Sequence, residues 1–341
     1  MGQVVTIGLD IAKSVFQVHG VDAVGEVMVR RQVRRPQMLQ FFAKQPACLI
    51  GIEACASAHY WARELSRLGH QVKLMPPSYV KPYVKRQKND AADAEAICEA
   101  VTRPTMRFVE VKSPEQQSVM VLHRVRMMLM RQRIQLSNAI RGHMAEFGLV
   151  APIGREGLQG LINLLEAAEQ RVPDEAAVCL QMLAGQLRLV NQQILETDRR
   201  IRTSARATEV GRRLMTIPGV GPLLASALVA TVADPKAFKT GRNLAAWIGL
   251  VPKQNSSGGK ERLGGITKQG DRYLRQLLVV GALAVVRYAE RNGTRRPWLV
   301  QLLARRSTKV ATVALANKTA RMAWAIMTSG ESYREPELRA A

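Results

Sequence analysis

The sequence is poor in aromatic residues, cysteines and acidic residues. Aromatic residues make up 5% of 341 residues while 47% are hydrophobic, so the cores must be built from aliphatic side chains and methionine. The four cysteines lack the paired spacing of a structural zinc site and are too few for a disulfide scaffold, so we expect reduced thiols. No apolar run reaches the roughly 18 residues of a membrane span, and the first residues resemble a strand rather than a signal peptide. We expect a cytoplasmic protein without membrane contact.

The shortage of acidic residues leaves 50 Lys and Arg against 27 Asp and Glu, a formal charge of +23. This excess is larger than solubility requires and favours a polyanionic partner, with nucleic acid as the first candidate. A nucleoid-associated location follows from that interpretation. The length exceeds what one hydrophobic core usually organises, so two or more domains are expected.

The N-terminal third predicts an α/β domain over residues 1–110. The expected order is three antiparallel strands, a short helix, a buried strand, an amphipathic helix closed by Gly69, a further strand and an alanine-rich helix from Asp90. A basic loop precedes that last helix. Its candidate nucleic-acid contacts are Lys85, Arg86 and Lys88.

Four acidic residues of this domain are candidate metal ligands. Asp10 and Glu53 each end a predicted strand, and Asp90 and Asp93 are one helical turn apart on one face. Carboxylates gathered in this way repel one another unless divalent cations lie among them, and oxygen ligands suit Mg²⁺ or Mn²⁺. Two such ions could clamp the attacking and leaving oxygens of a phosphodiester. Taken singly, each acid also fits a purely structural role, for example Asp90 as a helix N-cap.

Residues 111–206 predict two long helices, over 113–147 and 174–204, with Gly and Pro around 148–160 breaking the pattern. The first helix is basic, and Arg124 and Arg131 are candidate nucleic-acid contacts. The second has a heptad seam, which favours a coiled-coil arm that joins copies into a dimer or tetramer. The alternative is a helical hairpin that packs within its own chain. The seam consists of Leu180, Leu183, Leu187, Val190, Ile194, Thr197 and Ile201.

Residues 207–330 predict a mainly helical domain, followed by a flexible tail over 331–341. The stretch I-P-G-V-G between two helical segments resembles a helix-hairpin-helix element, in which Gly219 and Gly221 free backbone N–H groups for a DNA phosphate. A glycine-rich turn between packed helices is the alternative. Further on, N-S-S-G-G-K-E-R-L-G-G-I-T-K-Q-G exposes two serines among glycines and cations. Its candidate phosphate contacts are Lys260, Arg262 and Lys268, and Arg272, two residues after the stretch, is a further candidate nucleic-acid contact.

Four motifs together resemble the DEDD transposases of insertion sequences, a group related to the Piv DNA invertases. They are G-L-D-I-A-K, G-I-E-A, K-N-D-A-A-D-A and S-S-G-G-K-E-R-L-G-G-I-T-K, and the resemblance covers about residues 4–328. It implies the fold class α/β plus all-α: an RNase H-like domain similar to RuvC, a helical arm, and a helical C-terminal domain.

The resemblance also implies a chemistry. Asp10, Glu53, Asp90 and Asp93 would be the DEDD ligands of two Mg²⁺ or Mn²⁺ ions, and the family's nucleophilic serine falls on the S-S-G-G pair. Such enzymes cut and rejoin double-stranded DNA through a phosphoserine link and are guided by a structured RNA. We prefer Ser257, which directly precedes Gly258 as in the family's Ser-Gly feature, and keep Ser256 as the alternative nucleophile.

Three other functions fit parts of the sequence. A RuvC-like junction resolvase or nuclease would use water, and the serine loop would then only contact DNA. Sugar kinases and actin-like ATPases share the fold, but they place a Gly-Ser/Thr phosphate turn where this chain has Ile11-Ala12-Lys13. An architectural DNA binder would need no metal.

Overall fold

The computed structural model describes residues 2–85, 89–166, 172–294 and 296–335. Arg86 and Lys88, two of the candidate nucleic-acid contacts, lie outside the described residues. Internal contacts divide the chain into an N-terminal unit, Met1–Pro114, and a C-terminal unit, Glu115–Ala341. Within the described ranges, no helix is long and apolar enough to cross a membrane.

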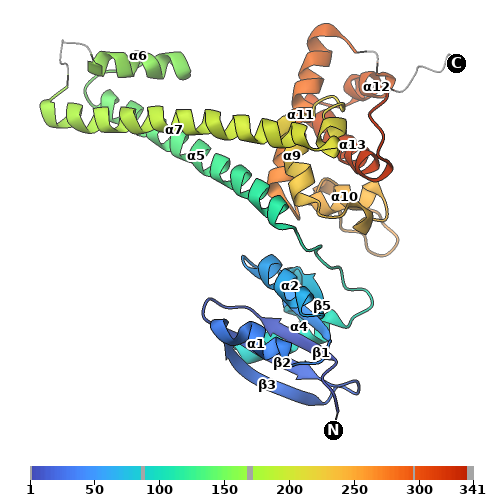
Figure 1. Cartoon of the computed structure of the whole chain (residues 1–341). Helices are drawn as coiled ribbons and strands as arrows, with labels where there is room; N and C mark the ends of the chain where they lie inside the picture. The colour runs from blue at the N-terminus through green and yellow to red at the C-terminus, as the bar shows by residue number, and fades with distance from the viewer. Residues whose placement is uncertain (1, 86–88, 167–171, 295, 336–341) are drawn as a thin grey trace. The chain divides into compact units, whose positions relative to one another are not determined.

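The N-terminal unit is built on a mixed five-stranded sheet in the order β3-β2-β1-β4-β5 (Figure 1). The first three strands form the expected antiparallel meander, and β4 and β5 run parallel to β1. The strands are β1 Thr6–Asp10, β2 Val15–Val21, β3 Val27–Arg34, β4 Leu49–Glu53 and β5 Gln71–Met75. The helices are α1 Met38–Ala43, α2 Ala58–Arg67, α3 Pro77–Val80 and α4 Asp90–Val101, with 3₁₀ turns at Arg35–Gln37 and Lys81–Tyr83.

Helices cover both faces of this sheet. The buried side chains of Leu9, Phe16 and Ile52 pack on one face with Trp61 and Leu65 of α2. The expected helix end is slightly displaced, because Leu68 is the C-cap of α2 and Gly69 follows it with a φ of 92°. This left-handed conformation is the one that glycine adopts just after a helix.

Helix α4 packs on the opposite face, and a glycine permits its close approach. A Cβ atom on Gly8 of β1 would lie 2.1 Å from the Ala94 carbonyl oxygen and 2.4 Å from the Cys98 nitrogen. Only a residue without a side chain allows α4 to lie so close to the strand that ends in Asp10. The contact at Gly8 therefore sets how closely α4 packs on β1.

The C-terminal unit starts with the helices α5 Pro114–Ala145, α6 Arg155–Glu166 and α7 Asp174–Ala207 (Figure 1). The helical pattern breaks after α5 as expected, but the break is shorter than the expected 148–160, because α6 begins at Arg155. Leu161 and Ile162 of α6 are buried against Ile140 of α5 and Leu187 of α7. Tertiary packing thus supplies the stability that the glycine-containing sequence lacks.

The heptad seam of α7 is buried within its own chain. Leu180, Leu187, Val190, Ile194, Thr197 and Ile201 are all buried, and Leu183 is partly buried. Leu129 of α5 packs with Val190 and Ile194, and Arg126 of α5 forms an ion pair with Asp198. This is the packing expected of an intrachain hairpin, so self-association through another surface stays a prediction.

The remaining helices share one large aliphatic core. They are α8 Glu209–Leu214, α9 Pro222–Thr231, α10 Gly241–Ile248, α11 Arg272–Asn292, α12 Pro297–Arg305 and α13 Thr308–Ser329, with a 3₁₀ turn at Pro235–Ala237. A small hairpin of β6 Pro252–Gln254 and β7 Leu263–Ile266 carries the two serines between α10 and α11. Residues 331–335 follow α13 without regular secondary structure.

We expect Gly8→Ala to lower the stability of the N-terminal unit by roughly 1–3 kcal/mol, because the new methyl group overlaps the backbone of α4. Gly185→Ala in α7 is the matched control, since a Cβ atom there meets nothing within 4 Å, and it should be neutral or stabilising. Thermal unfolding of the full chain measures both. An unchanged midpoint for Gly8→Ala would show that α4 does not need this close approach.

Candidate metal centre

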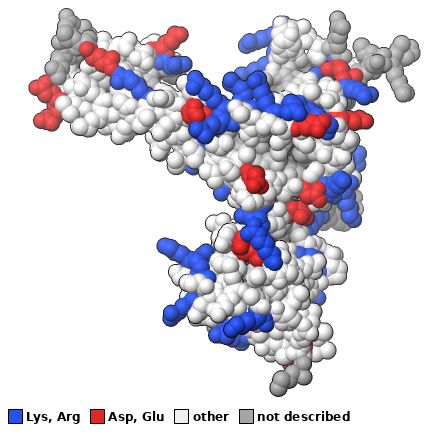
Figure 2. All heavy atoms as spheres, viewed as in Figure 1, with Lys and Arg blue, Asp and Glu red and all other residues white. Residues whose placement is uncertain are grey.

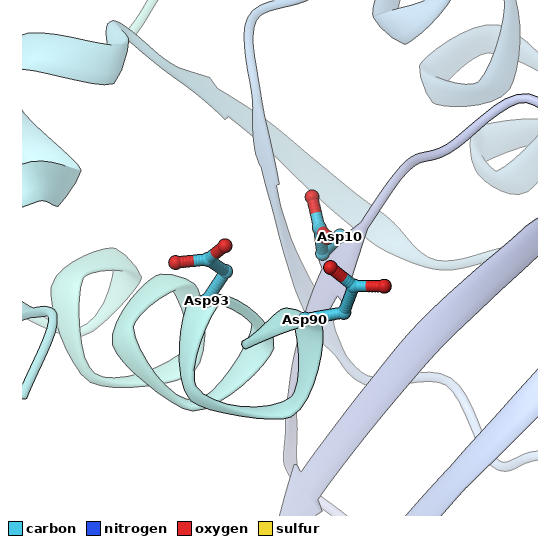
Figure 3. A group of neighbouring side chains, drawn as sticks. All are labelled: Asp10, Asp90 and Asp93. Carbon is cyan, nitrogen blue, oxygen red and sulfur yellow. The ribbon is translucent and has the colours of Figure 1, made fainter. Parts of the chain in front are cut away.

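Three of the four expected carboxylates meet at one point of the N-terminal unit. Asp10 ends β1, and Asp90 and Asp93 lie in the first turn of α4. Each offers an oxygen atom within 4.8 Å of the others (Figure 3). The N-cap of α4 is Asn89, whose side chain accepts a hydrogen bond of 2.8 Å from the Ala92 N–H. The structural interpretation of Asp90 as the N-cap is therefore wrong, and its carboxylate is available to bind a metal ion.

Glu53 lies at the margin of this group. It ends β4, which runs parallel to β1 with Leu9 opposite Ile52. Asp10 and Glu53 are the next residues of these two strands, so they lie at neighbouring strand ends. Its charge is close enough to raise the pKa of Asp10. Among the described residues, however, the set of acids within 4.8 Å of one another holds Asp10, Asp90 and Asp93 without Glu53.

The electrostatics of the three acids point to a cation. Burial, followed by the negative charges of Asp93, Asp90 and Glu53, raises the pKa of Asp10 to about 6, although a hydrogen bond from the Ile11 backbone opposes the shift. Burial is the larger cause of this shift, and the neighbouring carboxylates add a repulsion that a bound cation would offset. A set of oxygen ligands alone is the set that Mg²⁺ and Mn²⁺ prefer. The donor set therefore fits such an ion.

Arg35 holds the loop that follows Asp10, a role that the sequence did not reveal. Its Nε donates a hydrogen bond of 2.7 Å to the Lys13 carbonyl oxygen, and Nη2 donates one of 3.3 Å to that of Ala12. The guanidinium also lies over the rings of Phe16 and Trp61, 5.1 and 5.4 Å from their centroids. Only the fold brings Arg35 to a loop 22 residues earlier, so no local motif indicates it.

The two serines are presented at the tip of the β6–β7 hairpin. Gly258 and Gly259 both have positive φ, 57° and 75°, and the Lys260 N–H donates to the Ser257 carbonyl oxygen at 3.1 Å, as in a type I′ turn. The Ser256 hydroxyl accepts a hydrogen bond of 3.2 Å from the Arg262 N–H. In the described part of the chain, the Ser257 hydroxyl makes no hydrogen bond. Of the two exposed serines, Ser257 therefore has the hydroxyl that is more available to react.

The other candidate nucleic-acid contacts have varied surroundings. Lys85 forms an ion pair with Glu95 of α4. Gly219 has a φ of 87°, and a Cβ atom there would lie 2.8 Å from the Gly281 carbonyl oxygen of α11, so packing alone accounts for that glycine. Gly221 is the N-cap of α9 and has open space around it. The remaining candidates are exposed: Arg124, Arg131, Lys260, Arg262, Lys268 and Arg272.

The sheet order and the position of the acids define a class of protein. Carboxylates at the end of a central strand and on a helix flanking a mixed five-stranded sheet are consistent with an RNase H-like enzyme, in which bound metal ions act on phosphodiesters. Basic side chains predominate on the visible face of the N-terminal unit (Figure 2), and the whole chain has 50 Lys and Arg against 27 Asp and Glu, an excess that favours a nucleic-acid substrate.

Comparison with known proteins identifies the family. Residues 7–148 match a model of DEDD transposases of the IS110 type, and residues 211–296 match that of the Transposase IS116/IS110/IS902 family. A probable family 20 transposase of Pseudomonas aeruginosa is 50% identical over 96% of this chain and 98% of its own length. The transposase of insertion sequence element IS1328 of Yersinia enterocolitica is 40% identical over 98% and 99%. That of IS1111A of Coxiella burnetii is 40% identical over 98% and 92%.

The chain belongs to the IS110 family of insertion-sequence transposases. It is a DNA-cutting enzyme of the DEDD type, and the cluster of Asp10, Asp90 and Asp93 is consistent with its metal site. The expectation from sequence of a transposase is thus confirmed.

We expect Asp10 to contribute stability to the metal-free protein that is lost as the pH rises from about 4 to about 6, because the folded state retains a proton on Asp10 that the unfolded chain has released. Burial lowers the pKa of His123 to about 4, which gives the opposite slope over this range, so the contribution of Asp10 is isolated by comparison with the Asp10→Asn variant. Asp10→Asn should therefore raise the melting temperature of the metal-free protein at pH 7.5 and change it little at pH 4. Mn²⁺ should stabilise the parent above pH 6 and the variant much less. Equal stabilisation of the parent and the variant by Mn²⁺ would show that Asp10 is not a metal ligand.

Arg35→Gln should lower the apparent Mn²⁺ affinity by about tenfold, since the loop beside Asp10 loses two hydrogen bonds and its ring contacts. Arg34→Gln, which removes the same charge at the exposed neighbouring position, is the control. Titration of the melting temperature with Mn²⁺ compares the two. Equal Mn²⁺ affinities for the two variants would show that Arg35 contributes only its charge and does not position the loop.

Proposed function

We propose that this transposase cuts and rejoins double-stranded DNA through a covalent phosphoserine intermediate on Ser257. The observation that carries the proposal is the exposed type I′ turn, which presents a Ser257 hydroxyl without a hydrogen-bond partner in the described structure. Lys260, Arg262 and Lys268 are exposed near it in the sequence and would offset the charge of a phosphate. Ser256, whose hydroxyl already accepts a hydrogen bond, is the alternative nucleophile.

The proposed metal site would hold two Mg²⁺ or Mn²⁺ ions on Asp10, Asp90 and Asp93, with Glu53 as the fourth ligand. Bound ions would stabilise the charge that develops on the phosphate and favour the ionised form of the attacking hydroxyl. Activation by a metal is required because no histidine occurs in the serine hairpin to act as a base. The serine belongs to the C-terminal unit and the acids to the N-terminal unit, so the proposal requires both to act on one phosphodiester, in one copy of the chain or in two.

The proposed exchange conserves the phosphodiester. Ser257 Oγ loses its proton and forms a bond to phosphorus, while the bond from phosphorus to the 3′ oxygen breaks and that oxygen takes up a proton. The 5′ phosphate stays on the serine. A 3′-hydroxyl of another strand can then attack the phosphoserine, release the Ser257 hydroxyl and join the strands without an external energy source. A water nucleophile would instead leave free ends, as in the resolvase alternative.

We also propose a structured RNA guide and a homo-oligomer, a dimer or tetramer, as partners. Both follow from the family resemblance alone, because the charge of +23 fits a nucleic-acid partner of either kind and does not distinguish RNA from DNA. Such a guide would supply the sequence specificity by base pairing, so that the protein needs to recognise mainly backbone and shape.

Ser257→Ala should abolish both cutting and joining, because the variant lacks the attacking hydroxyl. Water cannot replace it, since water cannot form the protein–DNA link that conserves the energy of the broken phosphodiester. Denaturing gel electrophoresis of a labelled DNA substrate with Mg²⁺ would show a protein-linked strand with the parent and none with the variant. Ser256→Ala is the matched control and should retain the adduct. A Ser257→Ala enzyme that still produces free ends would establish water as the nucleophile, whereas loss of the adduct only in Ser256→Ala would move the nucleophile by one residue.

A further inference from the structure

A cavity of about 640 Å³ in the C-terminal unit is not used by the reaction described above. It lies beside the glycine-rich turn between α8 and α9, where Pro218 and Gly219 form part of its wall. Val285 and Tyr288 of α11 line another side, Arg296 precedes α12, and Glu335 comes from the segment after α13. Its volume is within the range of roughly 300–1,000 Å³ for sites that hold small organic ligands.

Arg296 and Glu335 form a bidentate ion pair at this cavity. Arg296 Nε donates to Glu335 Oε1 at 2.6 Å, and Nη2 donates to Oε2 at 3.3 Å. The hydrogen bond from Arg296 lowers the pKa of Glu335, so the carboxylate is ionised at neutral pH. The planar guanidinium fork pairs with two oxygens of a phosphate in the same way as with a carboxylate. Glu335 thus occupies a position that suits a phosphate.

The segment that carries Glu335 is held by few polar contacts. The Tyr333 N–H donates to the Thr216 hydroxyl at 2.9 Å, and the Glu331 N–H donates to the Ser329 hydroxyl at 3.2 Å. The Glu335 side chain is 52% exposed, whereas that of Arg296 is 23% exposed. Tyr333 of this segment packs on the core, so we expect the Glu335 side chain to turn away from Arg296 while Tyr333 stays in place. An ion pair with so exposed a partner costs little to break.

The walls of the cavity suit an unpaired base. Val285 and its alanine neighbours are apolar, and Tyr288 is 67% exposed. Proteins that bind single-stranded nucleic acid combine a cation for the backbone with an aromatic ring on which a base stacks. A base within a duplex has no free face for such a contact.

We propose that this cavity binds one nucleotide of an unpaired stretch of nucleic acid, with its phosphate on Arg296 in place of Glu335 and its base against Tyr288. In the free protein, Glu335 lowers the affinity for nucleic acid. When a strand binds, one anion replaces another at Arg296, so the guanidinium is never left without a partner. The proposal rests on the DNA binding of a transposase and is independent of the serine step.

A double-mutant cycle on the full chain tests this proposal by measuring nucleic-acid binding under conditions in which the DNA is not cut. The probes are fluorescein-labelled 20-residue oligonucleotides, namely single-stranded DNA, single-stranded RNA and duplex DNA, titrated in EDTA and followed by anisotropy. Glu335→Gln should tighten single-strand binding by about two- to fivefold, because Arg296 is released. Glu331→Gln is the matched control, since it removes the same charge from an exposed side chain that forms no ion pair within the described residues.

Arg296→Gln should weaken single-strand binding by about tenfold, and Glu335→Gln should then have no further effect. Tyr288→Ala should weaken single-strand binding and leave duplex binding unchanged. Unchanged melting temperatures establish that each variant is folded. The proposal is overturned if Glu335→Gln tightens binding no more than Glu331→Gln, if its effect persists in the Arg296→Gln background, or if duplex binding responds as strongly. The DNA and RNA arms identify which strand the site prefers.

Discussion

The close packing of α4 on β1 is the contact on which the metal centre depends. Gly8 lets the backbone of α4 at Ala94 and Cys98 approach the strand, and Asn89 caps the helix one turn earlier. Asp90 and Asp93 then lie next to Asp10 although their charges repel. The apolar packing of the sheet and α4 must overcome that repulsion in the metal-free protein, and a divalent cation converts it into attraction. The site is therefore stable only as part of a folded domain.

The N-terminal fold could be predicted well from sequence because its signals are local. Alternating strands, the glycine after α2 and the alanine-rich helix from Asp90 each have a short-range pattern, and all were found within a few residues of their positions. Asp10, Asp90 and Asp93 could be identified because they end a strand or begin a helix. Glu53 was expected in the same group, and its place at the margin depends on side-chain geometry that no periodicity records.

What the sequence did not predict depends on contacts between distant segments. Helix α6 follows two glycines and is stabilised by packing on α5 and α7. The heptad seam has the spacing of an intermolecular coiled coil, yet it is buried in an intrachain hairpin, since the same pattern serves both arrangements. Arg35 and Glu335 act on partners 22 and 39 residues away, and neither lies in a recognisable motif.

The central claim is that Asp10, Asp90 and Asp93 form the metal site of a DNA-cutting enzyme. Anomalous diffraction at the manganese absorption edge, from crystals of the full chain grown with Mn²⁺, tests it most directly. The account predicts at least one strong anomalous peak at about 2.1–2.3 Å from oxygen atoms of all three aspartates, the range for a hard divalent ion. Strong peaks elsewhere, with none at these three carboxylates, would contradict it.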